Sequence, residues 1–204
     1  PPEQSANGIV DAFVHVMEQY LTYPTDAKVQ DRFAEGLLLT LIEEGPKVLA
    51  EPDNYAARAN VMWTATMALN GLIGAGVPQD WATHMIGHEL TALHGLDHAQ
   101  TLAIILPSLL IQQRESKREK LLQYASRIWG LSAGSEESRI EQAIARTRGF
   151  FESLGVATHL SAYGITAEAL PRLLAKLEQH GRFPLGERKS LLRENCQAIL
   201  EQAL

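Results

Sequence analysis

Apolar residues recur at helical spacing along nearly the whole chain, and this periodicity restricts the fold more than any other feature of the sequence. Val29, Phe33 and Leu37, for example, are each four residues apart, so they lie on one face of an α-helix. No stretch of strand length alternates apolar and polar residues between turn residues. The pattern therefore predicts an all-α protein.

Glycine, proline and capping residues divide this pattern into successive helices. The third helix is rich in Ala, Met and Leu and carries no charge after Arg58, which predicts a central position in the core. Asp80 is the predicted N-cap of the fourth helix, and Gly95 is its predicted C-cap. The expected ranges are 4–21, 26–49, 54–72, 81–94, 97–112, 115–130, 136–154, 166–180 and 186–203.

The size and composition of the chain suit one domain. Its 204 residues, of which 46% are hydrophobic, can bury a sizeable core without disulfides, so we expect a single helical domain over 1–204.

Cys196 has no second cysteine to pair with and is expected to be a small core residue. The lone cysteine and the lack of a signal-peptide pattern indicate a reducing compartment, and the expected location is the cytoplasm.

Charge and hydropathy disfavour two classes of partner. The net charge of −6 is modest, and Lys and Arg form no long basic stripe, so nucleic acid and anionic membranes are poor candidates. The segment 112–120 alternates positive and negative residues, which predicts a solvated helix face. The best apolar run, 101–111, is shorter than the ~20 residues of a membrane-spanning helix and contains Pro107.

Two groups of metal-binding residue types stand out. Asp11 and His15 are four residues apart in a helical pattern, so their side chains project from one helix face and can hold one ion together. The second group contains four histidines, His84, His88, His94 and His98. A site that combines three imidazoles with one carboxylate would suit a divalent ion such as Zn²⁺ or Fe²⁺, whereas Ca²⁺ and Mg²⁺ prefer more oxygen ligands.

A turn inside the second group decides whether its ends can meet. On one unbroken helix, His84 and His98 would stand about 21 Å apart. Gly95 occupies the place of a helix C-cap, and Asp97 followed by Gln100 has the form of an N-cap with its capping-box partner. The chain is therefore expected to bend at 95–97 and to return His98 toward His84 and the first helix.

Spacing alone leaves open which histidines bind a metal and which class of metalloprotein the chain belongs to. His84 and His88 would make an equally good pair four residues apart, so spacing does not decide which histidines bind. The sequence from His88 begins like the H-E-x-x-H motif of zinc peptidases, but Ala92 occupies the fifth position. An all-α metal phosphohydrolase is a further alternative, although its usual adjacent His-Asp pair does not occur. His159 and His180 stand alone and are predicted surface histidines.

These residues resemble the signatures of the iron-containing, metal-dependent alcohol dehydrogenases, specifically the carboxy-terminal helical domain of that family. The segment 7–15 and the Glu-Gln-Tyr at 18–20 are similar to the first signature, and His84, His88 and His98 match the spacing of the second. Segments 70–81 and 94–100 are similar to the subgroup of broad-range NADPH-dependent aldehyde reductases, also called butanol dehydrogenases. The resemblance covers essentially the whole chain and implies a single dehydroquinate-synthase-like α-domain.

The resemblance also implies a division of roles. It makes Asp11, His15, His84 and His98 the metal ligands, and it makes His88 a catalytic non-ligand for proton relay or substrate orientation. The implied reaction is reduction of a small aldehyde, or oxidation of the alcohol, with NADP(H), while Fe²⁺ or Zn²⁺ polarises the substrate oxygen. An imidazole that titrates near neutral pH is a suitable proton donor.

One part of such an enzyme has no counterpart in this sequence. The family holds its dinucleotide mainly in an amino-terminal α/β domain, and no such segment occurs in the chain. We therefore expect the carboxy-terminal half of a two-domain enzyme, with that domain and a small substrate as partners, and a homodimer also fits the resemblance. The alternative from another class is a non-catalytic helical metal-binding or scaffold module that keeps the ligands.

Overall fold

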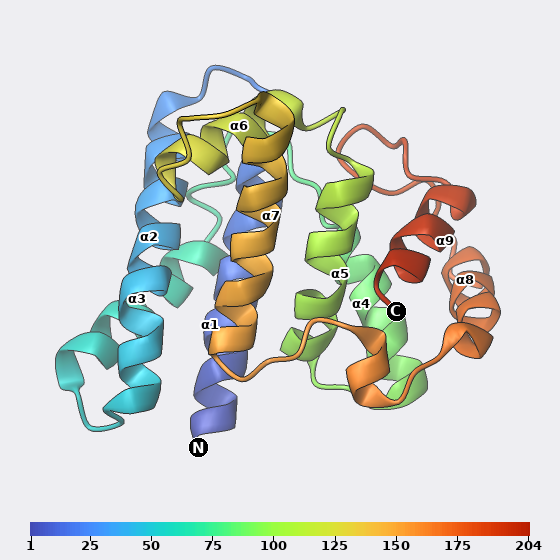
Figure 1. The fold of residues 1–204 in the computed structure, drawn as a ribbon, viewed down its shortest axis with the longest axis horizontal. Helices are drawn as coiled ribbons and strands as arrows, with labels where there is room; N and C mark the ends of the chain where they lie inside the picture. The colour runs from blue at the N-terminus through green and yellow to red at the C-terminus, as the bar shows by residue number, and fades with distance from the viewer.

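The predicted all-α fold is confirmed by the computed structural model, which describes all 204 residues (Figure 1). Two short 3-10 helices, Leu160–Tyr163 and Ala167–Ala169, precede the eighth α-helix. The α-helices are α1 (Pro2–Tyr20), α2 (Lys28–Ala50), α3 (Tyr55–Leu69), α4 (Ala82–His94), α5 (His98–Gln112), α6 (Arg118–Arg127), α7 (Glu136–Ser153), α8 (Leu170–Gln179) and α9 (Arg193–Gln202).

Helices α1 and α5 form the centre of the molecule. Helix α1 contacts α2, α3 and α5, and α5 also contacts α4, α7 and α9 (Figure 1). Ile9, Phe13 and Met17 of α1 are fully buried at intervals of four residues, and every side chain from Leu102 to Leu110 of α5 is buried. Helices α1 and α5, which carry three of the four predicted ligands, are therefore held by neighbours on several sides.

The predicted turn between α4 and α5 is also confirmed. Gly95 ends α4 with φ of 70°, in the left-handed region that glycine adopts without steric cost. Asp97 and Gln100 form a capping box, in which the Asp97 N–H donates to Gln100 Oε1 at 3.0 Å. The turn places α4 and α5 side by side, and Gly87 of α4 lies so close to α5 that an added Cβ would be 2.6 Å from Thr101 Oγ1.

The start of α4 differs from the prediction, because its N-cap is Trp81 and not Asp80. Trp81 has φ of 64°, a left-handed conformation that residues with a side chain rarely adopt. The Asp80 carboxylate accepts from the Ala82 N–H at 2.9 Å and lies 2.7 Å from Lys117 Nζ. Asp80 therefore still organises the start of α4, from one position earlier and with a lysine partner that the local sequence does not reveal.

The prediction of a solvated helix face over 112–120 is wrong for two of its lysines, and α6 begins only at Arg118. Lys117 and Lys120 are buried. Lys117 Nζ contacts the Asp80 carboxylate, both carboxylate oxygens of Glu187 at 2.9 Å and the carbonyl oxygen of Leu21 at 2.7 Å. Alternating charge did not show this, because the carboxylates come from distant segments.

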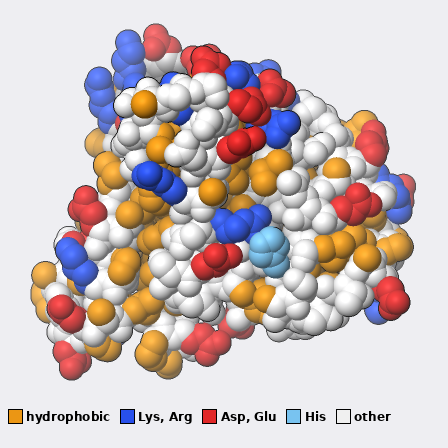
Figure 2. Space-filling view, viewed as in Figure 1, with side chains coloured by type: hydrophobic (Ala, Val, Ile, Leu, Met, Phe, Trp, Pro, Cys, Tyr) orange, Lys and Arg blue, Asp and Glu red, His pale blue; other side chains and the backbone are white.

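Helix α3 is peripheral, so the prediction of a central third helix is also wrong. Met62 and Trp63 are 71% and 68% exposed, and Figure 2 shows hydrophobic side chains gathered over the side of the molecule that α2 and α3 form. The buried residues of α3 are the small Ala57, Thr64 and Ala68. A helix with a single charged residue can thus still turn its large apolar side chains outward.

The last predicted helix begins later than expected, at Arg193. The preceding segment 181–192 is a loop, closed by a bridge between Leu185 and Leu191, and its Glu187 reaches the buried Lys117. Cys196 is fully buried in α9, as predicted. None of the helices combines the length and apolar character that crossing a bilayer requires.

Candidate metal centre

The four predicted donors come from three helices that meet. Asp11 and His15 lie one turn apart on α1, His84 lies in the first turn of α4, and His98 opens α5. One donor atom from each residue lies within 4.8 Å of all the others. The structure thus brings together all four residues that the resemblance assigns as ligands.

The distances among these donor atoms fit a small ion. Asp11 Oδ1 lies 3.5 Å from Nε2 of both His15 and His98. It lies 3.9 Å from Nε2 of His84, and that nitrogen is 3.2 Å from Nε2 of His15. Donor atoms at about 2.0–2.1 Å from a tetrahedral ion are about 3.4 Å apart. The observed spacing therefore suits one divalent first-row ion.

The carboxylate of Asp11 gives an independent indication. Its Oδ1 is buried and accepts no hydrogen bond from any group of the protein. A buried carboxylate oxygen without a partner is costly and rare. A cation among the four donors would supply the missing partner.

Electrostatics favour neutral imidazoles at this site. Burial lowers the pKa of His15, His84 and His98 below the ordinary value of 6.5. The imidazole of His84 lowers the pKa of His15 further, whereas the Asp11 carboxylate opposes the shift of all three. The neutral imidazole is the form that coordinates a metal, so the site is prepared for binding near neutral pH.

The two other histidines of α4, His88 and His94, do not belong to the donor group. His88 follows His84 by one turn and is exposed, and its ring stacks on the ring of His98 with centroids 5.3 Å apart. His94, at the end of α4, is exposed and lies outside the donor group. Among the histidines that spacing left open, the turn at Gly95 brings His98, and not His94, next to Asp11, His15 and His84.

The two isolated histidines differ from each other. His180 is exposed, as predicted, and its Nδ1 lies 2.6 Å from Oε1 of the buried Glu89. His159 is half-buried, with Nε2 at 3.0 Å from the Arg148 guanidinium, so its prediction as a surface residue holds only in part.

Two residues at the centre were given no role by the sequence. Glu18 of α1 is buried and binds Nδ1 of His84 through Oε2. Burial, and secondarily the Asp80 carboxylate, raise the pKa of Glu18, whereas the N–H of Thr83 lowers it. Glu18 could have been found from its spacing of seven residues after Asp11, which places both on one side of the same helix.

Trp81 is the second such residue. The centroid of its ring lies 5.4 Å from that of His15 and 5.3 Å from that of His84, with the rings edge to face. Its indole Nε1 donates to Gln79 Oε1 at 2.9 Å. No local signal identifies Trp81, because its position depends on the left-handed turn before α4.

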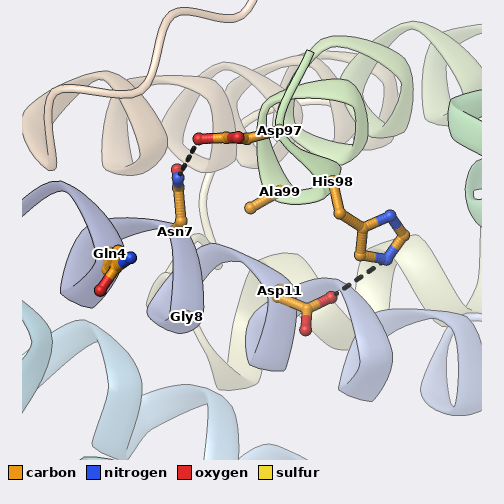
Figure 3. Close-up of a pocket in the computed structure, with 7 residues that line it drawn as sticks. All are labelled: Gln4, Asn7, Gly8, Asp11, Asp97, His98 and Ala99. Carbon is orange, nitrogen blue, oxygen red and sulfur yellow. Dashed lines mark hydrogen bonds and ion pairs between the residues drawn. The ribbon is translucent and has the colours of Figure 1, made fainter. Parts of the chain in front are cut away.

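An open cleft of about 300 Å³ is lined by two of the four donor residues, Asp11 and His98. Figure 3 shows that Asn7 bridges α1 to Asp97 at the start of α5, with 3.0 Å between Nδ2 and Oδ2, and that Asp11 and His98 point toward one another. The side chains of Asp11 and His98 are 31% and 38% exposed. A small molecule can therefore approach the side chains of Asp11 and His98 from this side.

Comparisons with known proteins assign the chain to a family. The sequence profile of the Fe-containing alcohol dehydrogenase family, C-terminal, matches residues 5–204. The chain is 66% identical to the NADPH-dependent aldehyde reductase YqhD of Escherichia coli, covering 100% of this chain and 52% of that protein. It is 34% identical to NADH-dependent butanol dehydrogenase A of Clostridium acetobutylicum, covering 98% of this chain and 51% of that protein.

Solved structures agree. The substrate- and cofactor-free form of E. coli YqhD superimposes with a TM-score of 0.99 at 65% identity, over 100% of this chain and 54% of that one. NADH-dependent butanol dehydrogenase A from Thermotoga maritima superimposes with a TM-score of 0.92 at 29% identity, over 100% of this chain and 52% of that one. The chain spans about half the length of these relatives. It belongs to the Fe-containing alcohol dehydrogenase family and corresponds to the C-terminal, helical part of that family.

Proposed function

We propose that this chain is the metal-binding half of an NADP(H)-dependent alcohol dehydrogenase or aldehyde reductase, with one divalent ion held by Asp11, His15, His84 and His98. The observation that carries the proposal is the convergence of three imidazoles and a buried, unpartnered carboxylate oxygen in a chain of this family. The high identity to an NADPH-dependent reductase favours NADP(H) over NADH.

The nitrogen-rich donor set favours Fe²⁺ or Zn²⁺. When bound, the ion supplies Lewis acidity toward the oxygen of a small aldehyde or alcohol, and NADP(H) supplies or accepts the hydride. A proton must also reach or leave that oxygen, and this task falls to residues of the chain.

His88 is the residue that we assign to this proton transfer or to orientation of the substrate. It is exposed beside the donor group, and its ring stacks on that of His98. Burial and the neighbouring His98 lower the pKa of His88, so the imidazole is neutral near pH 7 and can exchange a proton with substrate or water. The indole of Trp81 packs edge to face with the rings of His15 and His84.

The remaining half of the enzyme is expected in an amino-terminal domain, which we propose binds the dinucleotide. Holding two reactants in the right geometry can account for ~7–11 kcal/mol of a barrier. The 204-residue chain should therefore bind metal but reduce aldehydes poorly without that domain.

The ligand assignment is tested by metal content. Single Ala substitutions of Asp11, His15, His84 and His98 should each reduce bound metal well below one ion per chain, measured by elemental analysis after purification. His94→Ala and His180→Ala are controls from exposed positions and should retain the ion. Equal retention in all six variants would refute the site.

The catalytic assignment is tested with the longer protein that includes the amino-terminal domain. It should oxidise NADPH in the presence of a short aldehyde such as butanal, and the isolated chain should not do so at a comparable rate. His88→Ala should keep its metal and lose turnover or change its pH profile. If the longer protein binds metal but shows no aldehyde-dependent oxidation, the alternative of a non-catalytic metal-binding module is favoured.

A further inference from the structure

We infer that Glu18 is a positioning residue of the metal centre, which fixes the ring and the proton of His84 so that Nε2 faces the other donors. The inference deepens the proposed function and rests on it.

Glu18 joins α1 to the first turn of α4 through three contacts. Its Oε2 is hydrogen-bonded to Nδ1 of His84, and its Oε1 accepts from the Thr83 N–H at 2.6 Å. Its backbone carbonyl accepts from the Asp80 N–H at 2.9 Å. The side chain is only 3% exposed, so these protein groups replace water around the carboxylate. One residue of α1 thus holds the backbone and the ligand side chain of the segment 80–84.

The contact with His84 determines which ring nitrogen is available. When Nδ1 carries the proton and donates it to the carboxylate, Nε2 keeps its lone pair. That nitrogen lies 3.2 Å from Nε2 of His15 and 3.9 Å from Oδ1 of Asp11. A proton on Nε2 would instead block coordination. A carboxylate at the far nitrogen also makes the imidazole a stronger ligand and restricts its rotation.

The contact is specific to one ligand. Nδ1 of His15 and Nδ1 of His98 have no carboxylate partner, whereas Nδ1 of His84 does. His84 also sits on α4, whose distance from α1 is not determined by helical spacing as that between Asp11 and His15 is. Glu18 therefore acts on a ligand whose position relative to α1 depends on tertiary contacts.

The chain contains a second pair of the same chemistry that can serve as a control. Glu89, also buried, lies on α4 and binds Nδ1 of His180 at 2.6 Å. Neither residue belongs to the donor group. Glu89→Gln replaces a buried carboxyl group at a histidine contact by an amide, as Glu18→Gln does, but at residues outside the donor group.

The experiment compares Glu18→Gln and Glu89→Gln in the chain as it stands. Zn²⁺ affinity is measured by competition with a chelator, and the environment of the ion is read from the visible spectrum of the Co²⁺-loaded protein. Glutamine matches the shape of glutamate but brings one acceptor oxygen and an amide N–H₂, so it cannot serve both Thr83 and His84. We expect Glu18→Gln to bind Zn²⁺ about 10–100-fold more weakly and to change the Co²⁺ spectrum. Glu89→Gln should match the wild type in both.

Each outcome has a distinct meaning. Wild-type affinity and spectrum in Glu18→Gln would overturn the role of Glu18 and leave the proposed metal site intact. Equal weakening in Glu89→Gln would also overturn it, because the effect would then be general. Absence of metal binding by the wild-type chain would instead refute the proposed function.

If Glu18→Gln does not fold, Glu18→Asp replaces it, since it keeps the carboxyl group but draws it away from His84. Weaker binding then supports the role, and unchanged binding overturns it.

Discussion

Replacing Gly87 by alanine should weaken metal binding by separating the two helices that carry His84 and His98. The added Cβ would lie 2.6 Å from Thr101 Oγ1, whereas ordinary contacts lie at 3.4–4 Å, so the helices must part by roughly 1 Å. Rotation of Thr101 away from the new Cβ would break the hydrogen bond that its hydroxyl donates to the carbonyl oxygen of His98 at 2.7 Å. Overpacking of this kind costs about 1–3 kcal/mol.

The free energy of this strain should appear mainly in metal affinity. The metal-free variant can relax by letting α4 and α5 part, and alanine also favours the helix by about 1 kcal/mol over glycine. The metal-free variant should therefore lose at most about 2 kcal/mol of stability, which is the largest strain less the helix gain. Its melting temperature should then fall by no more than about 8 °C, since 1 kcal/mol corresponds to ~2–4 °C in a protein of this size. Metal binding must draw the helices back together, so affinity should fall about 5- to 150-fold, as 1–3 kcal/mol requires.

The assay is Zn²⁺ competition with a chelator, together with thermal unfolding of the metal-free protein. The double variant Gly87→Ala, Thr101→Ala removes the hydroxyl that the new Cβ meets, and should recover most of the lost affinity. Wild-type affinity in Gly87→Ala, or a double variant that binds no better than the single one, would refute the idea that the spacing between α4 and α5 controls the site.

Two further predictions concern stability. Lys117→Met should lower the free energy of unfolding by about 3–5 kcal/mol in urea titrations, because the carboxylates of Asp80 and Glu187 stay buried without their counter-ion; a loss below 1 kcal/mol would contradict this. The metal-free chain should lose stability as pH falls below about 6.5, because the folded state lowers the pKa of the ligand histidines and the unfolded chain takes up protons first. Melting temperatures that stay flat between pH 7 and 5 would argue against neutral ligands.

The parts of the fold that depend on local chemistry were predictable from the sequence. Helical periodicity predicted the class of fold, and the turn at Gly95 with its Asp97 capping box was recognised because both depend on neighbouring residues alone. The pairing of Asp11 with His15 is local in the same sense. These features require only that each segment adopts its own preferred conformation.

The features that were missed depend on contacts between distant segments. Lys117 is buried because Asp80 and Glu187 meet it from far away in the sequence, which alternating charge does not reveal. Helix α3 is rich in apolar residues yet peripheral, since its inner face needs only small side chains against α1 and α2. Sequence pattern shows which faces can be buried, but not which ones find a partner.

The segment 80–84 shows how such distant contacts build the candidate site. Trp81 adopts a left-handed conformation that costs about 1–2 kcal/mol for a residue with a side chain. This conformation persists because the neighbouring residues are held from two directions, Asp80 by Lys117 and Thr83 by Glu18. The same contacts place the indole against His15 and aim His84 at the donors of α1. Strain is thus concentrated where two helices meet at the proposed ion. The family resemblance could name the candidate ligands from local signatures, whereas the residues that orient them depend on contacts between distant segments.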